Sequence, residues 1–524
     1  MGEHFMKTFS KLLFNRIILI MFLLVFVGTL TTSNLNGLVI GTLLMIILIV
    51  VSALILFGHL FKFNYVTVGQ KVWLVVKQGW TALGLMVVLQ LTLVTSLMGV
   101  NGFNSGLIKW AVTSNTLSEG SYLYNDFVRY PNHFSLMLIE RGIYHVTRSM
   151  GITNLNLVFV ILNIILIDGA MAILYLILRR SLKRMSVWGL VPICILLSPR
   201  LVVFSNDSLL LFSITLVIFA AQLLIIEFNS GFSNYVKIIL TNVMLGCGGF
   251  MAYLARPSSF ILGLVLLVAM LVAIGKRKHK NAQFIKGIIL GALILILTIG
   301  GLTGINQKNT TQQTIITNNS ALKLLPSYYV MLGMNASTMG NYSQIDEQYS
   351  ASFTKRNAQR AANTKVIKQR LKKFGVLGYV RFLVQKNYHT TSDGTFAGLL
   401  DEPQGTAHFK FIRSFFFKFD KHVTIYKTIA QVFWIMITLG LLLSILDTSP
   451  LMRILQLTQF SFLIVLLISE GGDGSFMLGL VPVTYVLALV GWSRLRKSVQ
   501  DRSILQVNPA GITTLVDHLI PGAH

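Results

Sequence analysis

Long apolar stretches separated by short polar segments dominate this 524-residue chain. A helix needs about 20 apolar residues to cross the hydrocarbon of a membrane. We therefore expect an all-α integral membrane protein, whose first apolar stretch stays as a span rather than being removed as a signal peptide. The pattern predicts about twelve membrane-spanning helices, near 13–31, 37–58, 80–99, 154–177, 186–203, 206–227, 236–254, 258–275, 284–304, 427–446, 452–469 and 475–493. Pro192 and Pro199 interrupt the fifth of them.

Basic residues between the predicted spans indicate which side of the membrane each loop faces. Clusters lie at 179–184, 276–286 and 494–502, after the fourth, eighth and twelfth spans. Short basic loops tend to stay in the cytoplasm. Twelve spans with both termini in the cytoplasm place all three clusters there, so the span count and the charge pattern agree. We expect a multi-pass protein of the cell membrane.

Two long segments, 100–153 and 305–426, then face away from the cytoplasm. The predicted organisation is a transmembrane bundle with a long external loop, an external domain, three further spans and a cytoplasmic tail. In residue numbers these parts are 1–304 with the loop at 100–153, then 305–426, 427–494 and 495–524.

Composition excludes several classes of protein. Hydrophobic residues make up 54% of the chain and charged residues 12%, against roughly 25% charged in an average soluble domain. Mean hydropathy is +0.70, so neither a soluble nor a disordered protein is expected. With 44 Lys or Arg against 18 Asp or Glu the net charge is +26. A nucleic-acid binder can be that basic but not that apolar, so we expect no nucleic-acid partner.

The external segment 305–426 carries sixteen basic and six acidic residues, a net charge of +10. Long loops are exempt from the rule that places positive charge inside, so this excess needs another explanation. The stretch 355–373 combines helix-forming residues with eight basic residues and no acid. It predicts a helix lying on anionic lipid headgroups. A basic helix surrounded by water is the alternative.

Most acidic residues fall on or near the predicted outer face, where Arg200 and Arg256 also end two spans. Arginine is a fixed cation whose planar fork suits phosphate, although side chains that only reach toward the interface are the alternative. Asp168 lies in the middle of a span, and we interpret it as a hydrogen-bonded residue of the bundle. Acids, arginines, tyrosines and prolines from distant segments gathering at one face predict an outward-facing active site.

Six strings near that face carry a family resemblance. They are GSYLYNDFVRYPNHFSLML (120–138), LSPRLVVFSNDSLLLF (197–212), MAYLARPSSF (251–260), PSYYVMLGMNASTMGNYSQID (326–346), YHTTSDGTF (388–396) and SEGGDGSFMLGLVP (469–482). In this order they resemble the motifs of bacterial polytopic glycosyltransferases of the GT-C fold, the relatives of protein mannosyltransferases. The resemblance covers about 100–482.

The resemblance implies a GT-C-like helical bundle with a catalytic first loop and external helices. It also implies a hexosyltransferase that moves a sugar from a polyprenyl phosphate to a hydroxyl, with inversion. The acceptor would be an envelope polymer, a glycolipid or a protein, and membrane lipids would surround the chain. No cofactor is certain, although a divalent cation on Asp207 is possible within the family pattern. The residues implied are Asp126 and Asp207 as catalytic, and Arg129, Tyr130, Asn132, Arg200, Arg256, Tyr328, Tyr329, Asp393 and Glu470 as substrate-binding.

Structural roles remain open for three of these acids. Asp126 suits a loop cap, Asp207 an N-cap and Asp393 a turn. The chain also departs from the family pattern, because Asn104 stands where an acid is usual in the first loop, and asparagine cannot act as a base. The arginine that commonly accompanies an acid in the last external turn is missing beside Glu470.

Two other functions remain open. A transporter or lipid flippase would depend on Asp168 and on internal repeat symmetry, of which the sequence shows no clear sign. A catalytically silent protein of envelope assembly would bind lipid phosphate, and Asn104 favours that alternative.

Overall fold

The computed structural model describes residues 2–35, 79–97, 110–182, 186–202, 204–277, 281–316, 322–400 and 409–504. Within these residues the chain is helical, apart from turns and one isolated β-bridge between Leu400 and Phe417. Ten helices in the described part are long and apolar enough to cross a membrane. The predicted all-α membrane fold is therefore confirmed.

The ten long helices match ten of the twelve predicted spans. They are α1 (Gly2–Leu30), α4 (Gly79–Leu97), α8 (Leu155–Ser181), α10 (Asn206–Asn229), α11 (Tyr235–Ala255), α12 (Phe260–Lys276), α13 (Ala282–Gln312), α18 (Val423–Leu443), α19 (Pro450–Ile468) and α20 (Val481–Ile504). The predicted span 37–58 lies outside the described residues, and so do Asn104 and most of the tail 495–524.

The fifth predicted span is wrong as a single long helix. Residues 186–203 instead form η2 (Val187–Leu190), α9 (Val191–Leu197) and η3 (Ser198–Val202), a shorter apolar element over Val187–Val202. Pro192 lies in the first turn of α9, where a missing N–H is tolerated, and Pro199 lies in the 3-10 turn that ends it. Proline removes a backbone donor and disfavours the helical conformation in the residue before it.

Both predicted external segments contain helices. The first holds α6 (Tyr122–Arg129) and α7 (Pro131–Ser149), separated at Tyr130 because Pro131 begins the second helix. The second holds α14 (Pro326–Gly333), α15 (Gln344–Ala351), α16 (Arg356–Thr391) and α17 (Lys410–Arg413). The predicted basic helix at 355–373 is thus present as the first part of α16. α13 reaches Gln312, beyond its predicted end at 304.

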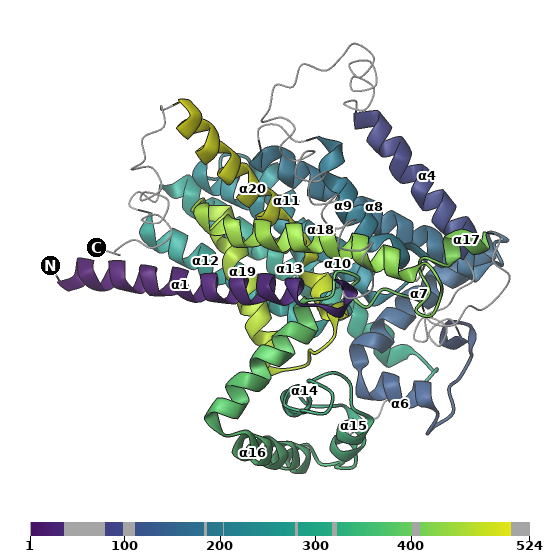
Figure 1. The fold of residues 1–524 in the computed structure, drawn as a ribbon. Coiled ribbons are helices and arrows are strands. Elements are labelled where there is room, and N and C mark those ends of the chain that lie inside the picture. Colours follow the sequence, from purple (N-terminus) through teal and green to yellow (C-terminus); the bar gives the residue numbers. More distant parts are fainter. Residues whose placement is uncertain are drawn as a thin grey trace.

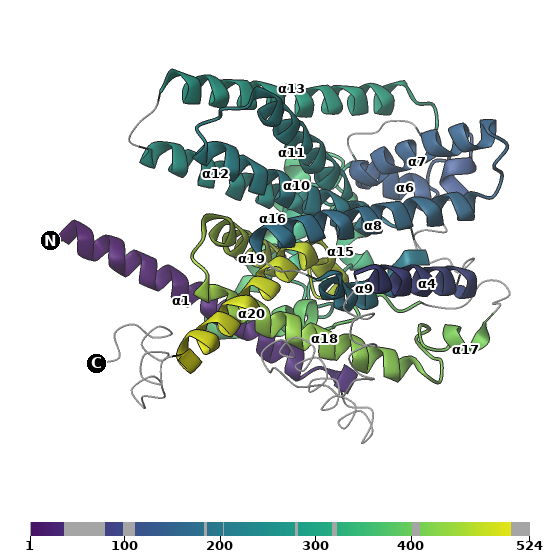
Figure 2. The ribbon, with the colours of Figure 1, turned by 90° about the horizontal axis from the view of Figure 1, so that it is seen from above.

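The spans lie side by side in one bundle. Figure 2 shows the start of α1, the C-terminal end of α12, the start of α13 and the end of α20 at the same end of this bundle, and α7 toward the opposite end. Figure 1 shows α6, α14, α15 and the first part of α16 grouped beside the bundle. The basic residues at 276–277 and 494–497 therefore share an end with the N-terminus, as the charge pattern predicts.

Burial differs between the spans. The core is built mainly by α10, α18, α19 and α20, where Trp434, Phe462 and Tyr485 are fully buried. By contrast, α12 and α13 expose leucine and isoleucine along their length, including Leu267 and Ile296. Apolar side chains exposed around the outside of a bundle are expected where the solvent is lipid.

Candidate functional site

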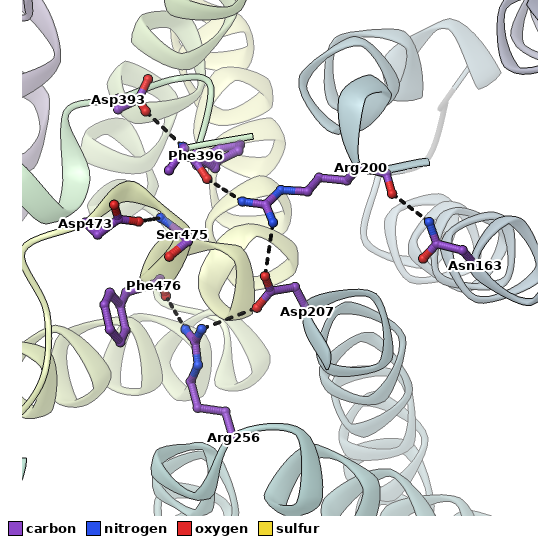
Figure 3. A network of polar contacts seen from close by, with 10 residues as sticks. Asn163, Arg200, Asp207, Arg256, Asp393, Phe396, Asp473, Ser475 and Phe476 are labelled. Atoms are coloured by element: carbon purple, nitrogen blue, oxygen red, sulfur yellow. Dashed lines mark hydrogen bonds and ion pairs between the residues drawn. The ribbon is translucent and has the colours of Figure 1, made fainter. Parts of the chain in front are cut away.

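One carboxylate joins two arginines where η3, α10 and α11 meet (Figure 3). Asp207 lies in the first turn of α10, where the helix dipole favours a negative charge. Arg200 Nη1 lies 3.3 Å from Asp207 Oδ2, and Arg256 Nη2 lies 3.3 Å from Asp207 Oδ1. Arg256 caps α11 in an extended conformation, which the following Pro257 favours. The three groups together carry a net charge of +1.

The same two arginines reach the turns that hold two other quoted strings. Arg200 Nη2 donates to the carbonyl of Phe396 at 2.8 Å, and Arg256 Nη1 donates to the carbonyl of Phe476 at 3.2 Å. The Arg256 guanidinium also lies over the Phe476 ring, 4.8 Å from its centre. The strings at 197–212, 251–260, 388–396 and 469–482 therefore meet around Asp207, as Figure 3 shows.

The first-loop string forms a second polar group around Asp126. Asp126 Oδ2 lies 3.1 Å from His133 Nδ1, across the break between α6 and α7. The ring of Tyr130 stacks on His133 with centres 5.2 Å apart, and its hydroxyl lies 3.5 Å from that of Tyr328. Sequence reasoning missed His133, although it stands in the same string as Asp126. The carboxylate and imidazole together form a pair that can take up a proton.

Two neighbouring tyrosines of α14 lie beside this pair. Tyr328 is fully buried, and burial raises its pKa well above the usual range. Burial likewise raises the pKa of Tyr329, and the negative charges of Glu470 and Asp126 add to that rise. Both phenols are therefore neutral hydrogen-bonding groups at physiological pH.

Glu470 connects the two polar groups. Burial raises the pKa of this carboxyl group, while the positive charges of Arg256, His133 and Lys386 act in the opposite direction. Glu470 thus lies within electrostatic reach of Arg256 on one side and of His133 on the other. The groups around Asp207 and Asp126 are thus both within electrostatic reach of the same carboxyl group.

Other predicted site residues take part in contacts within the protein. Arg129 Nη1 pairs with Glu347 Oε2 at 3.4 Å, and the Tyr342 hydroxyl donates to the same carboxylate oxygen at 2.8 Å. Asn132 stands half-buried in the first turn of α7. Arg129 therefore connects the first loop to α15, which sequence reasoning did not anticipate.

The carboxylate oxygens of Asp393 accept hydrogen bonds from the turn that follows this residue. It accepts hydrogen bonds from the backbone N–H groups of Thr395 (2.8 Å) and Ala397 (2.9 Å) and from the Thr395 hydroxyl. The Asn34 amide adds a further bond of 2.8 Å. This geometry matches the turn-forming alternative for Asp393.

A metal ion would need several oxygen or nitrogen ligands converging on one point. Among the described residues no group of three or more His, Cys, Asp or Glu does so. Each Asp207 oxygen faces an arginine instead. The donor set around Asp207 therefore does not fit a divalent cation, and positive charge is supplied by the two guanidinium groups.

Intramembrane Asp168 lies away from this site. Gln90 Nε2 of α4 donates to Asp168 Oδ1 of α8 at 2.5 Å. The expectation that Asp168 is hydrogen-bonded within the bundle is confirmed.

Comparison with known proteins identifies a family. A model of a family described as "conserved hypothetical integral membrane protein" matches residues 4–495. No curated protein and no solved structure matches the chain.

Proposed function

The chain belongs to the family of conserved hypothetical integral membrane proteins, and we propose that it is a membrane glycosyltransferase. Its donor is a sugar carried on a polyprenyl phosphate. Its acceptor is a hydroxyl group of an envelope polymer, a glycolipid or a protein. The observation that carries the proposal is the Arg200–Asp207–Arg256 bridge where η3, α10 and α11 meet, together with the Asp126–His133 pair.

The two arginines suit the phosphate of the donor. Arg200 and Arg256 are held by one carboxylate, so one positive charge remains uncompensated within the bridge. The Arg200 Nε–H is buried and has no hydrogen-bond partner among the residues that the structure describes. A bound phosphate oxygen would satisfy such a donor, and cations stabilise the negative charge that develops on a leaving phosphate.

Asp126 and His133 suit proton removal from the acceptor. The acceptor oxygen attacks the anomeric carbon from the face opposite the phosphate and forms the new glycosidic bond. The bond between that carbon and the phosphate oxygen breaks, and its electron pair leaves with polyprenyl phosphate. The hydroxyl proton passes to the Asp126 carboxylate, which His133 orients at 3.1 Å. The configuration at the anomeric carbon is inverted.

The position of the polar groups favours transfer over transport. A transporter places its binding groups near the middle of the membrane, between broken helices. Here the ionisable groups of the site lie at span ends and in the connections between spans. Asp168 lies in the middle of a span and bonds Gln90.

The test uses purified protein in lipid vesicles, a panel of radiolabelled polyprenyl-phosphate sugars and envelope acceptors. We expect transfer by the native chain and a loss of about 10²- to 10⁴-fold in Asp126→Asn, because general bases contribute that much. Glu119→Gln is the matched control, since Glu119 is an exposed acid seven residues earlier in the same loop, and it should transfer at the native rate. Undiminished transfer by a folded Asp126→Asn protein would remove Asp126 from the mechanism.

A further inference from the structure

Helix α16 bends sharply at one glycine. Gly375 has φ 61° and ψ −177°, a non-helical conformation inside the helix. Positive φ is readily adopted only by glycine. The bend divides α16 into a first arm, 356–374, and a second arm, 376–391, which Figure 1 shows running in different directions. We call the region around residues 374–377 the corner.

Contacts of both arms with the rest of the protein hold the corner in place. On the second arm, the Tyr388 hydroxyl donates to the carbonyl of Thr31 at 2.9 Å, and Trp434 Nε1 donates to the carbonyl of Thr391 at 2.8 Å. On the first arm, Arg370 pairs with Asp346 at 2.7 Å. The corner is therefore a rigid projection and not a loose loop.

The second arm presents an apolar stripe near the corner. Val376 and Leu377 are 83% and 85% exposed, and Val380 and Val384 are 54% and 46% exposed. Val376, Val380 and Val384 stand four residues apart, so they share one helix face. Exposure decreases along this face toward the bundle. Such a stripe is unfavourable in water, at about 25 cal/mol for each Å² of apolar surface, and marks an interaction surface.

Exposed basic side chains lie on both arms of the bend. Lys365, Lys368, Lys372 and Lys373 are exposed on the first arm, and Arg381 is exposed on the second. Lysine and arginine can lay their aliphatic stems along apolar surface and hold their charges at headgroup level. Each such residue adds about 1 kcal/mol of attraction to an anionic membrane surface.

The corner also lies at the level of the spans. The second arm leaves the bundle beside the C-terminal end of α1, where Gly28 packs against Tyr388 and Thr391. In Figure 1 the bend of α16 lies at a level within the length of α1 and not beyond its C-terminal end. A projection in that position meets the lipid that surrounds the bundle.

We propose that the corner inserts its apolar stripe (Val376, Leu377, Val380 and Val384) among the acyl chains of the leaflet nearest the C-terminal end of α1. The lysines of the first arm bind the headgroup phosphates of the same leaflet. The corner thereby anchors α14 and α15 to the membrane surface independently of the spans. This interaction does not depend on the proposed glycosyl transfer.

Depth-dependent quenching tests the insertion. Cysteines are placed singly at Leu377 and, as the matched control, at Ile345, an apolar residue of α15 that is 80% exposed, in a chain whose Cys194 and Cys247 are replaced by serine. An environment-sensitive fluorophore at 377 should be quenched several-fold by lipids that carry a nitroxide on the acyl chain. The fluorophore at 345 should be quenched by aqueous iodide instead.

Quenching of both positions by iodide alone would overturn the proposal and leave α16 a basic helix in water. A second measurement avoids the cysteine replacements. Lipids with a photoreactive group on the acyl chain are added to the native chain, and cross-linked peptides are mapped. Cross-links within 371–384 and none within 344–351 are expected, with a higher yield in anionic than in zwitterionic vesicles. Equal labelling of the two segments would contradict the proposal.

Discussion

The amine of Lys386 is buried where α16 meets α14 and the end of α19. Its side chain is fully buried, and Nζ donates to the carbonyls of Gly333 (2.8 Å), Leu467 (3.1 Å) and Ser469. Gly340 and Gly471 leave room for it, since a Cβ atom at either position would lie within 2.9 Å of the lysine. Lys386 thus connects the helix that carries Tyr328 and Tyr329 to the turn that carries Glu470.

Replacing Lys386 by methionine should destabilise the protein by several kcal/mol, because buried carbonyls that lose their donor cost about 1 to 3 kcal/mol each. The measurement is the melting temperature in detergent. Lys365→Met, an exposed lysine of the same helix, should leave it nearly unchanged. Equal effects of the two substitutions would show that the Lys386 contacts contribute little.

Lys386 should also give stability a dependence on pH. Burial lowers its pKa from 10.5 to about 7, and the negative charge of Glu470 acts in the opposite direction. Between pH 7 and pH 9 the unfolded chain therefore binds the proton that the folded chain releases, so stability rises with pH. The rise is at most about 1.4 kcal/mol per pH unit. Unfolding curves at several pH values measure this rise, and the Lys386→Met protein should not show it. If the unfolding free energies of the two proteins change with pH in the same way, Lys386 is not its source.

The sequence supplied part of the site at the level of single residues. Asp207, Arg200 and Arg256 could be predicted as a group because each adjoins a proline or begins a span at the same face. His133 and Lys386 could not, because each depends on a tertiary contact: His133 on the break between α6 and α7, and Lys386 on carbonyls 53 to 83 residues away. Asp393 resembled a site residue in sequence, yet its carboxylate is occupied by its own turn.

Helix ends determine how the site is positioned. The C-terminal residue of α14, Gly333, lies against the end of α19, so that an added Cβ would lie 2.1 Å from the carbonyl oxygen of Ser469. This contact fixes the distance between the tyrosines of α14 and Glu470. Spans of regular apolar pattern were predictable, because length and hydropathy alone define them. The element at 187–202 was predicted as a span because its composition is apolar, although its two prolines already marked the interruption that the structure shows.

Gly333→Ala should therefore destabilise the protein by several kcal/mol, since the backbone of α14 or α19 must move to admit the methyl group. The matched control is Gly142→Ala in the interior of α7, where nothing lies within 4 Å of the added atom. That change should be neutral or stabilise by up to about 1 kcal/mol. The measurement is the thermal unfolding of both variants. If Gly333→Ala destabilises the protein no more than Gly142→Ala does, the prediction is wrong.

At the scale of the whole molecule, the arrangement of spans places the segment before α6 and the end of α12 on opposite sides of the membrane. Glu119, before α6, and Lys276, at the end of α12, are both exposed. With both termini in the cytoplasm, a cysteine at position 119 should react with an impermeant reagent added outside intact cells. A cysteine at 276 should react only after the membrane is opened. The reverse pattern would invert the predicted topology and place the site in the cytoplasm.

Convergence of distant segments was predictable only as a shared face of the membrane. Hydropathy assigns each string to an end of a span, but it does not tell which spans are neighbours. The contact of Asp207 with Arg256 follows from the packing of α10 against α11, which is a property of the assembled bundle.

The most direct measurement follows both products of the native protein in sealed vesicles that contain a radiolabelled polyprenyl-phosphate sugar and an enclosed or external acceptor. Glycosyl transfer predicts one labelled glycoside of inverted configuration for each polyprenyl phosphate released. Movement of the intact labelled donor across the membrane, without consumption of the donor, would contradict glycosyl transfer and identify a lipid transporter instead.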